Sequence, residues 1–380
     1  MQKSRNSTLQ QAKDSKNDEF YTQLQDIEKE LMHYRNFFKW KTVFCNCDDP
    51  YESNFLKYFA INFNALKLKK LIATGYSTSS IAYTQLDLFW FKDLKDKKRK
   101  AYKIEIEEMY DINNDWSEDL EDIKILLQQW TWKNKLTLLD WDWDFRSNES
   151  IELLKEADVV VTNPPFSLFR DYVAQLIRYN KKFIILWNMN AITYKEIFPL
   201  IKDNKLWIWY GFNMSMVYKT KYPNLLEANR KFVISKWYDP DEWFLKVPAI
   251  CWYTNIDIKK RHEEILMYKK YTPIDYPTYE TFDAIDVGNI SEIPYDYNWI
   301  MWVPKTFMDK YNPEQFEILW YEREDENIKV WIKNMPKSFL DSYKKHWWKW
   351  HYTSWMKMLC FYTSDWIPKI PFSRILIRKK

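Results

Sequence analysis

Between residues 42 and 210, short apolar runs alternate with segments whose apolar residues recur every three or four positions. The runs have the length of buried strands and cover 42–47, 69–74, 135–139, 157–162, 182–188 and 205–210. Segments with helical spacing cover 19–38, 52–65, 148–156, 167–179 and 193–203. This alternation predicts an α/β fold in which helices cover both faces of a mostly parallel sheet. In such a sheet, ligands bind at the carboxyl ends of the strands.

The alternation ends near residue 212, and we place a domain boundary there. Residues 1–212 are then the catalytic core, with the charged stretch 92–122 as a surface loop or insertion. Residues 213–380 form a less regular region that ends in a basic tail. Residues 331–380 hold eleven Lys and Arg against two Asp, a net charge of +9, although the whole chain carries only +4. A basic, aromatic-rich segment suits a polyanion such as DNA, and a solvated basic end is the equal alternative.

The strand predicted at 157–162 runs directly into Asn163-Pro164-Pro165-Phe166. The two prolines stiffen this turn, which follows the carboxyl end of the strand. An exocyclic amine on a purine is a poor nucleophile until two acceptors that bind its hydrogens draw the nitrogen lone pair out of conjugation. The Asn163 side-chain oxygen and the Pro164 carbonyl are suited to that task, and Phe166 offers a flat face for a flipped base. A structural Asn-Pro-Pro turn is the simpler alternative for these four residues alone.

Several stretches together resemble the EcoRI-type adenine-specific DNA methyltransferases. They are DEFYTQ at 18–23, NCDDP at 46–50, DFRS at 144–147, VVTNPPFSLFR at 160–170, ITYKE at 192–196, NPEQFE at 312–317 and RILI at 374–377. The resemblance covers nearly the whole chain and is weakest over 76–135, 213–248 and 325–365. It implies a Rossmann-like core, S-adenosylmethionine as methyl donor and N6 of a flipped adenine in duplex DNA as acceptor.

The resemblance also assigns roles to residues. The catalytic residues are Asn163, Pro164, Pro165 and Phe166. The cofactor-binding residues are Phe20, Tyr21 and Thr22 beside the methionine part, the loop residues Asn46, Asp48, Asp49 and Pro50, and Asp144 with Phe145 at the adenine part. The loop after residue 45 departs from the family's usual glycine-rich form, which leaves the contacts of Asp48 and Asp49 open. A cap or turn role is the alternative for each acidic residue.

Partners and location follow from the same resemblance. We expect duplex DNA as substrate, a monomer, and a cognate restriction endonuclease that needs no direct contact. Candidate DNA contacts are Arg261, His262, Lys344, Lys345 and Lys349, with plain surface solvation as an equal alternative. No long apolar segment or signal peptide is evident, so we expect a cytoplasmic protein without a membrane span. The four cysteines suggest small buried thiols and no metal site.

Two other functions stay open. A protein-glutamine or RNA methyltransferase would use a similar motif, because a planar amide or amine needs the same two acceptors. An inactive DNA-binding relative would result if large rings at positions 141 and 143 blocked the cofactor. The basic C-terminal region and the family stretches favour the DNA enzyme over the first of these.

Glycine and tryptophan counts are both abnormal. The chain holds 3 Gly and 22 Trp, whereas about 27 glycines would be usual at roughly 7%. Tryptophans stand in turn contexts, as at 141, 143, 299 and 347–348, and the family favours small residues at 40, 141, 143, 299 and 302. We infer that most of these tryptophans are glycine in the cell, through UGA codons that its translation system reads as glycine. A truly tryptophan-rich protein is the alternative, and Trp252 is one ring that we expect to be real.

Overall fold

The computed structural model describes residues 21–47, 53–75, 101–113, 122, 125, 133–139, 144–164, 168–219, 230–242, 244–322, 331–347 and 352–380. Two compact units divide the chain. The first unit takes residues 1–189 and 213–256, and the second takes 190–212 and 257–380. Within the described residues, no helix is long and apolar enough to cross a membrane.

The first unit is built on a sheet of nine strands in the order β1-β8-β9-β7-β6-β2-β3-β4-β5. Its strands are β1 (Tyr21–Thr22), β2 (Thr42–Cys45), β3 (Lys70–Gly75), β4 (Tyr102–Ile106), β5 (Asn134–Leu138), β6 (Val159–Thr162), β7 (Lys182–Asn188), β8 (Trp207–Lys219) and β9 (Phe244–Thr254). Strand β8 begins in the part of the chain that clusters with the second unit.

The four central strands β3, β2, β6 and β7 are parallel to one another. The flanking pairs β3–β4, β4–β5, β7–β9 and β1–β8 are antiparallel. The chain runs from β2 outward to β3 on one side, and later from β6 outward to β7 on the other. The sheet is therefore mixed rather than mostly parallel, but its centre has the doubly wound order of a Rossmann-like fold.

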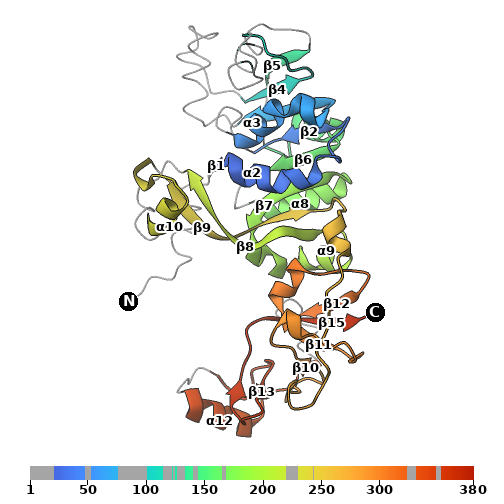
Figure 1. Ribbon diagram of the computed structural model, residues 1–380, viewed down its shortest axis with the longest axis vertical. Coiled ribbons are helices and arrows are strands. Elements are labelled where there is room, and N and C mark those ends of the chain that lie inside the picture. The colour runs from blue at the N-terminus through green and yellow to red at the C-terminus, as the bar shows by residue number, and fades with distance from the viewer. Residues whose placement is uncertain are drawn as a thin grey trace. The chain divides into compact units, whose positions relative to one another are not determined.

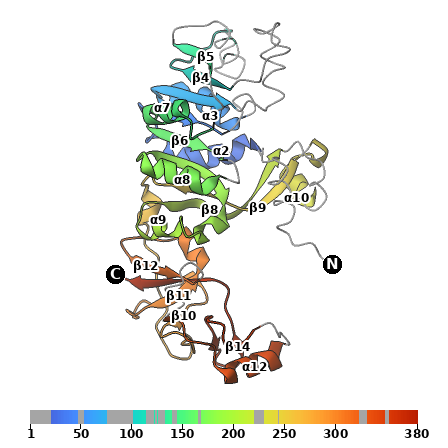
Figure 2. The same ribbon diagram turned by 180° about the vertical axis from the view of Figure 1, so that it is seen from behind.

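Helices cover both faces of this sheet. Figure 1 shows α2 (Leu24–Leu31) and α3 (Asn54–Ile61) over one face, and Figure 2 shows α7 (Asn148–Glu156) and α8 (Phe169–Arg178) over the other. The other helices described in this unit are α4 (Phe63–Leu66), α10 (Arg230–Ser235) and the 3-10 turns Met32–Tyr34 and Pro240–Glu242. Buried strands flanked by amphipathic helices explain the alternation seen in the sequence.

Serine caps begin two of the helices that start near the carboxyl edge of the sheet. The Ser53 hydroxyl accepts from the Phe55 backbone N–H at 3.2 Å, and the Ser147 hydroxyl accepts from that of Ser150 at 3.2 Å. Each cap satisfies a backbone donor that the first helical turn leaves open. The polar residues that follow β2 and β5 are thus held at defined helix starts.

The second unit contains a sheet of four strands in the order β10-β11-β15-β12. Its strands are β10 (Ile285–Asp286), β11 (Met301–Pro304), β12 (Phe316–Tyr321) and β15 (Arg374–Lys379), and β13 (Phe361–Tyr362) pairs with β14 (Pro368–Lys369). Its helices are α9 (Phe198–Lys202) and α12 (Lys337–Trp347), with 3-10 turns Met189–Thr193, Lys259–His262, Ile290–Glu292 and Lys305–Asp309. Trp302, Tyr279 and Leu376 lie in its buried core.

Three sequence expectations differ from this architecture. Within 92–122, predicted as a surface loop, residues 102–106 form the buried strand β4. The charged residues of β4 obscured the alternation of apolar and polar side chains that indicates a strand. Lys103 and Glu105 form a salt bridge at 2.8 Å, and Lys70 of β3 contacts Glu105 at 2.6 Å. The boundary near 212 is also displaced, because β9 returns to pair with β7 and carries 213–256 into the first unit.

The third difference concerns the basic tail. Residues 374–379 form β15, which pairs with β11 on one side and β12 on the other. Its buried residues Ile375, Leu376 and Ile377 are part of the core. The C-terminal segment is thus a structural part of the second unit, and its positive charge lies on a folded surface.

Candidate active site

Two asparagines follow neighbouring parallel strands at the centre of the large sheet. Asn46 comes directly after β2, and Asn163 directly after β6. The register Val43 to Val159 and Phe44 to Val160 brings these strand ends level. The connections of β2 and β6 run to opposite sides of the sheet, which makes this the switch point where α/β proteins bind ligands. Both asparagines are buried, at 4% and 7% exposed.

The catalytic motif is described only in its first half. Asn163 and Pro164 are both buried at the carboxyl end of β6. Pro165 and Phe166 lie outside the described residues. Helix α8 begins at Phe169, so few residues separate the buried strand β6 from this helix, one face of which is buried. An amide oxygen and a carbonyl at such a rigid link have few orientations available, which suits them to hold an amine in one geometry.

Asn46 is fixed by two hydroxyl groups. The Thr162 hydroxyl donates to the Asn46 backbone carbonyl, and the Tyr172 hydroxyl of α8 donates to Asn46 Oδ1. Burial raises the pKa of Tyr172 well above its usual 10, so the hydroxyl stays a neutral donor. Because Oδ1 is occupied, the Nδ2 group is the end of this amide that a ligand can use.

The chain turns sharply just after Asn46. Cys47 has a φ of 76°, in the left-handed region that favours glycine. A non-glycine residue held there stores of order 1–3 kcal/mol of strain, and such strain concentrates at ligand sites. Cys45 is buried and Cys47 partly buried, and neither forms a disulfide. Asp48, Asp49 and Pro50, which continue this loop, lie outside the described residues.

Thr22 presents a buried hydroxyl beside α3. Its backbone carbonyl accepts from Asn54 Nδ2 at 2.7 Å, near the start of that helix. The residue is 2% exposed, and its Oγ1 has no hydrogen-bond partner among the described residues. An unsatisfied buried hydroxyl costs about 1–3 kcal/mol, which a polar ligand group would recover. Phe20 and the side chain of Tyr21 lie outside the description.

Asp144 and Phe145 follow β5. Strand β5 runs in the same direction as β3, because β4 lies between them and is antiparallel to both. Since β3 is parallel to β2, the carboxyl ends of β5 and β2 lie at the same edge of the sheet. Arg146 donates to both Asp144 oxygens, at 2.8 and 2.6 Å. This guanidinium lowers the pKa of Asp144, which therefore remains ionised. A carboxylate accepts about four hydrogen bonds, so acceptor capacity remains for a ligand amine.

Phe145 and Asn46 are tied to the same helix. The buried Phe145 ring meets Tyr172 edge-on, with centroids 5.1 Å apart. Gln175, one turn further along α8, donates to the Phe145 backbone carbonyl at 2.8 Å. The helix that follows the catalytic motif thus fixes two segments assigned to the cofactor. Sequence reasoning missed Thr162, Tyr172 and Gln175; the spacing of three between Tyr172 and Gln175, directly after the motif, was the available signal.

The assigned residues therefore fall into three groups. Asn46, Asn163, Pro164 and Phe145 gather around β2, β6 and α8. Thr22 contacts the start of α3, and Asp144 follows β5. The start of α3 and the end of β5 lie at the same edge of the sheet. Phe20, Asp48, Asp49, Pro50, Pro165, Phe166 and the side chain of Tyr21 lie outside the description.

Two of the candidate DNA contacts have structural partners. Arg261 is stacked 3.9 Å from the Trp207 ring centre and donates to Asn204 at 2.6 Å, with only 10% of its side chain exposed. His262 lies between Asp257 and Glu314, with nitrogen–oxygen distances of 3.0 and 2.8 Å. Lys344 and Lys345 are in the last turn of α12, and Lys349 lies outside the description.

Comparison with known proteins identifies the family of this chain. The family described as Adenine-specific methyltransferase EcoRI matches residues 8–380. The chain is 41% identical over 333 residues to Type II methyltransferase M.EcoRI of Escherichia coli, covering 84% of this chain and 90% of that protein. It is 36% identical over 320 residues to Type II methyltransferase M.MgeORF184P of Mycoplasma genitalium, with coverage of 81% and 84%.

A third relative is Type II methyltransferase M.MpnI of Mycoplasma pneumoniae, 36% identical over 319 residues, with coverage of 81% and 83%. No solved structure matches this chain. The chain belongs to the EcoRI family of adenine-specific methyltransferases, and it is a DNA adenine methyltransferase with a Rossmann-like core.

Proposed function

We propose that Asn163 and Pro164 hold the N6 amine of an adenine flipped out of duplex DNA. The observation that carries this proposal is their burial at the carboxyl end of β6, level with Asn46 on β2. The Asn163 oxygen and the Pro164 carbonyl each accept one N6 hydrogen, which localises the nitrogen lone pair. Phe166 stacks on the flipped base, and Pro165 stiffens the turn. The rate of methyl transfer is then raised by the positioning of the amine and by hydrogen-bond acceptors that are already in place.

The methyl donor in this proposal is S-adenosylmethionine, which supplies an electrophilic methyl group on a sulfonium. The unpaired Thr22 hydroxyl and the Asn46 amide hydrogens fit the polar methionine end, together with Phe20 and Tyr21. Asp144 accepts from the adenine amine of the cofactor and Phe145 packs beside that ring. Asp48, Asp49 and Pro50 complete the loop after β2. Tyr172 keeps the Asn46 amide in the orientation that exposes its donor end.

Target recognition in this proposal belongs to 213–380, and chiefly to residues 257–380 of the second unit. Reading a DNA sequence takes side chains outside a catalytic core that is itself occupied by the flipped base. We further propose a monomer that works in the cytoplasm, as the modification partner of a restriction endonuclease encoded with it.

Methyl transfer with labelled cofactor tests this proposal. Duplex DNA, RNA and a protein extract are offered as acceptors, and labelled nucleosides are then separated. We expect N6-methyladenine from DNA alone. Label in glutamine or RNA would identify the other amino-methyltransferase classes, and DNA binding without transfer to any acceptor would identify an inactive relative.

The Asn163→Ala variant tests the catalytic residue. It should lower turnover at least 100-fold, by analogy with the loss of one preorganised hydrogen-bonding group, while leaving the affinity for the cofactor unchanged. Asn148→Ala, which removes an exposed amide at the start of α7, is the matched control and should stay active. Loss of cofactor binding in Asn163→Ala, with an unchanged circular dichroism spectrum, would refute the assignment.

A further inference from the structure

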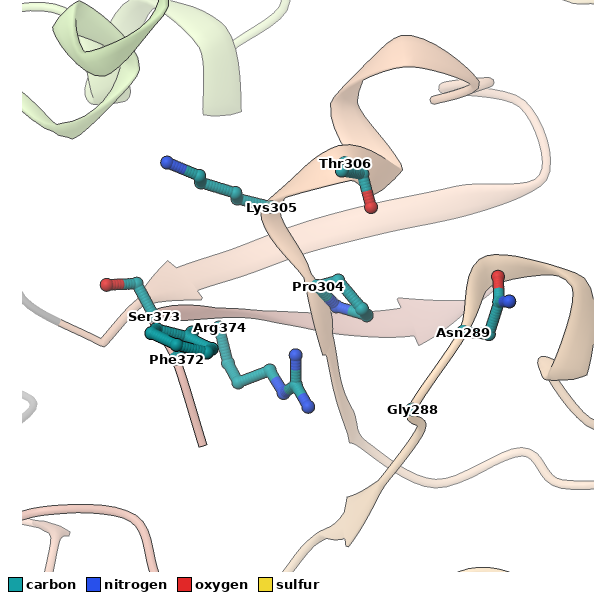
Figure 3. A pocket seen from close by; sticks show the side chains of 8 residues that line it. All are labelled: Gly288, Asn289, Pro304, Lys305, Thr306, Phe372, Ser373 and Arg374. Atoms are coloured by element: carbon teal, nitrogen blue, oxygen red, sulfur yellow. The ribbon is translucent and has the colours of Figure 1, made fainter. Parts of the chain in front are cut away.

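The small sheet of the second unit carries a hollow at one edge. The carboxyl ends of the parallel strands β10 and β11 meet the beginning of β15 there. The hollow has a volume of about 610 Å³ and is lined by Gly288, Asn289, Pro304, Lys305, Thr306, Phe372, Ser373 and Arg374. These residues come from three segments far apart in the sequence (Figure 3).

The lining has the chemistry of an anion site. It contains two cationic side chains, two hydroxyls and one amide, and no acidic side chain. In Figure 3 the Arg374 guanidinium lies below Pro304, and the Lys305 side chain extends away from it, with its Nζ 3.4 Å from Asn190 Oδ1. A ligand that is negatively charged and rich in hydrogen-bond acceptors fits this set.

Arg374 is held in place before any ligand arrives. Its Nε donates to Asp286 Oδ1 at 3.0 Å, and the Tyr279 hydroxyl donates to the same oxygen. Only 13% of the Arg374 side chain is exposed, and 6% of that of Asp286. A guanidinium fixed in this way loses little rotational freedom when its remaining N–H groups bind a phosphate or a base edge.

Phe372 lies next to this cation and is almost entirely in water. Its exposed fraction is 91%, and it is followed at once by Ser373 and Arg374. A phenyl ring that buries so little of its surface contributes little to the core. Beside a fixed guanidinium, it offers a flat face to a base or sugar, a combination that nucleic-acid binding proteins use on single strands and opened duplexes.

We propose that this hollow binds one strand of the target DNA, with one phosphate against Arg374, another against Lys305, and a base or sugar against the Phe372 ring. The inference rests on the proposed role of the second unit in target recognition. It adds the surface and the residues through which that unit holds the duplex. The phosphate contacts give affinity for any sequence, and the ring adds affinity where a nucleotide is unstacked.

Two variants test the hollow, with DNA affinity measured by fluorescence anisotropy at several salt concentrations. Phe372→Ala should weaken binding about tenfold, as for the loss of one base–aromatic stack, and Phe372→Trp should restore it. Lys305→Gln should make the slope of log affinity against log salt shallower by about 0.9, the value for one phosphate contact. Tyr268→Ala is the control, since it removes another exposed ring of this unit, 65% exposed, outside the hollow.

Cofactor affinity should be unchanged in all of these variants. Equal DNA affinity for Phe372→Ala and Tyr268→Ala, or an unchanged salt slope for Lys305→Gln, would overturn the inference. Adenine methylation by the unaltered enzyme is measured alongside DNA binding. If the proposed function is wrong, this assay yields no N6-methyladenine, whatever the binding results of the variants. Arg374 is not varied, because its loss would leave Asp286 buried without its cation.

Discussion

Replacing Trp237 with glycine should stabilise the protein, although the change deletes the largest side chain. Trp237 follows α10 with a φ of 65° and is 97% exposed. Its N–H bonds to the Ile234 carbonyl at 2.9 Å, and the Tyr238 N–H bonds to the Val233 carbonyl at 3.3 Å. These are the two bonds of a Schellman helix end, whose left-handed residue is usually glycine. The equivalent bonds after α8 place Asn180 at that position, with a φ of 49°.

Two other tryptophans stand where turns require glycine. Trp366 has a φ of 59° and ends the three-residue loop between β13 and β14, after a turn closed from its N–H to the Thr363 carbonyl at 2.9 Å. This is the glycine position of a G1 bulge. Trp40 has a φ of 61° at the third position of a turn closed from Lys41 to Phe38. None of the chain's glycines has a positive φ in the described residues.

The magnitude follows from backbone strain, because these three rings bury little. A non-glycine residue in the left-handed region costs about 1–2 kcal/mol. Glycine reduces this gain in folding free energy by roughly 0.5–1 kcal/mol, because its backbone loses more conformational freedom on folding. The net gain is about 0.5–1 kcal/mol per site, and roughly 2 kcal/mol for all three, since they lie in separate turns.

Urea unfolding followed by circular dichroism measures this gain in the triple variant Trp40→Gly, Trp237→Gly, Trp366→Gly. Trp252→Gly is the control of opposite sign: its ring is 0% exposed and meets Phe55 edge-on, so the cavity should cost about 3–5 kcal/mol. A triple variant no more stable than its parent would refute the strain argument. The codons decide the cellular residue: UGA read as glycine, verified by peptide mass spectrometry, supports recoding, and UGG excludes it.

Three further predictions concern other parts of the chain. Thr22→Val should raise stability by about 1 kcal/mol in urea unfolding, because an unsatisfied buried hydroxyl is lost, yet weaken cofactor binding in calorimetry; equal affinity would remove Thr22 from the site. Changing both Lys344 and Lys345 to Gln should make the salt slope of DNA binding shallower by about 1.8; an unchanged slope would make them solvated surface charges. Hydrogen bonds to Asp257 and Glu314 raise the pKa of His262 above 6.5, so its stabilisation is complete below pH 6.5 and lost as pH rises through the higher folded pKa. Urea unfolding at pH 5.5 and 8.5 should show this loss in the parent and not in His262→Gln; identical pH dependence would contradict it.

The sequence alone determined the core and the chemistry of this protein. Buried parallel strands need long apolar runs, so β2, β3, β6 and β7 were visible by composition and spacing. The motif at Asn163 was visible because a stiff polar turn after such a strand has few structural uses. The shortage of glycine was also a property of the sequence, and the family resemblance pointed to Trp40 as a position that favours a small residue. At Trp302 the structure gives a different environment: that ring is fully buried, although its N–H has no partner among the described residues.

Tertiary structure decided what local patterns do not encode. Strand β4 depends on its pairing with β3, where Lys70 forms an ion pair with Glu105, and no window of one strand contains that contact. The return of 213–256 to the first unit depends on the pairing of β9 with β7, which joins residues as far apart in the sequence as Ile184 and Thr254. Tyr172 reaches Asn46 across 126 positions. Contacts of this kind arise from packing, because side chains distant in sequence meet only after the sheet has brought their strands and helices together.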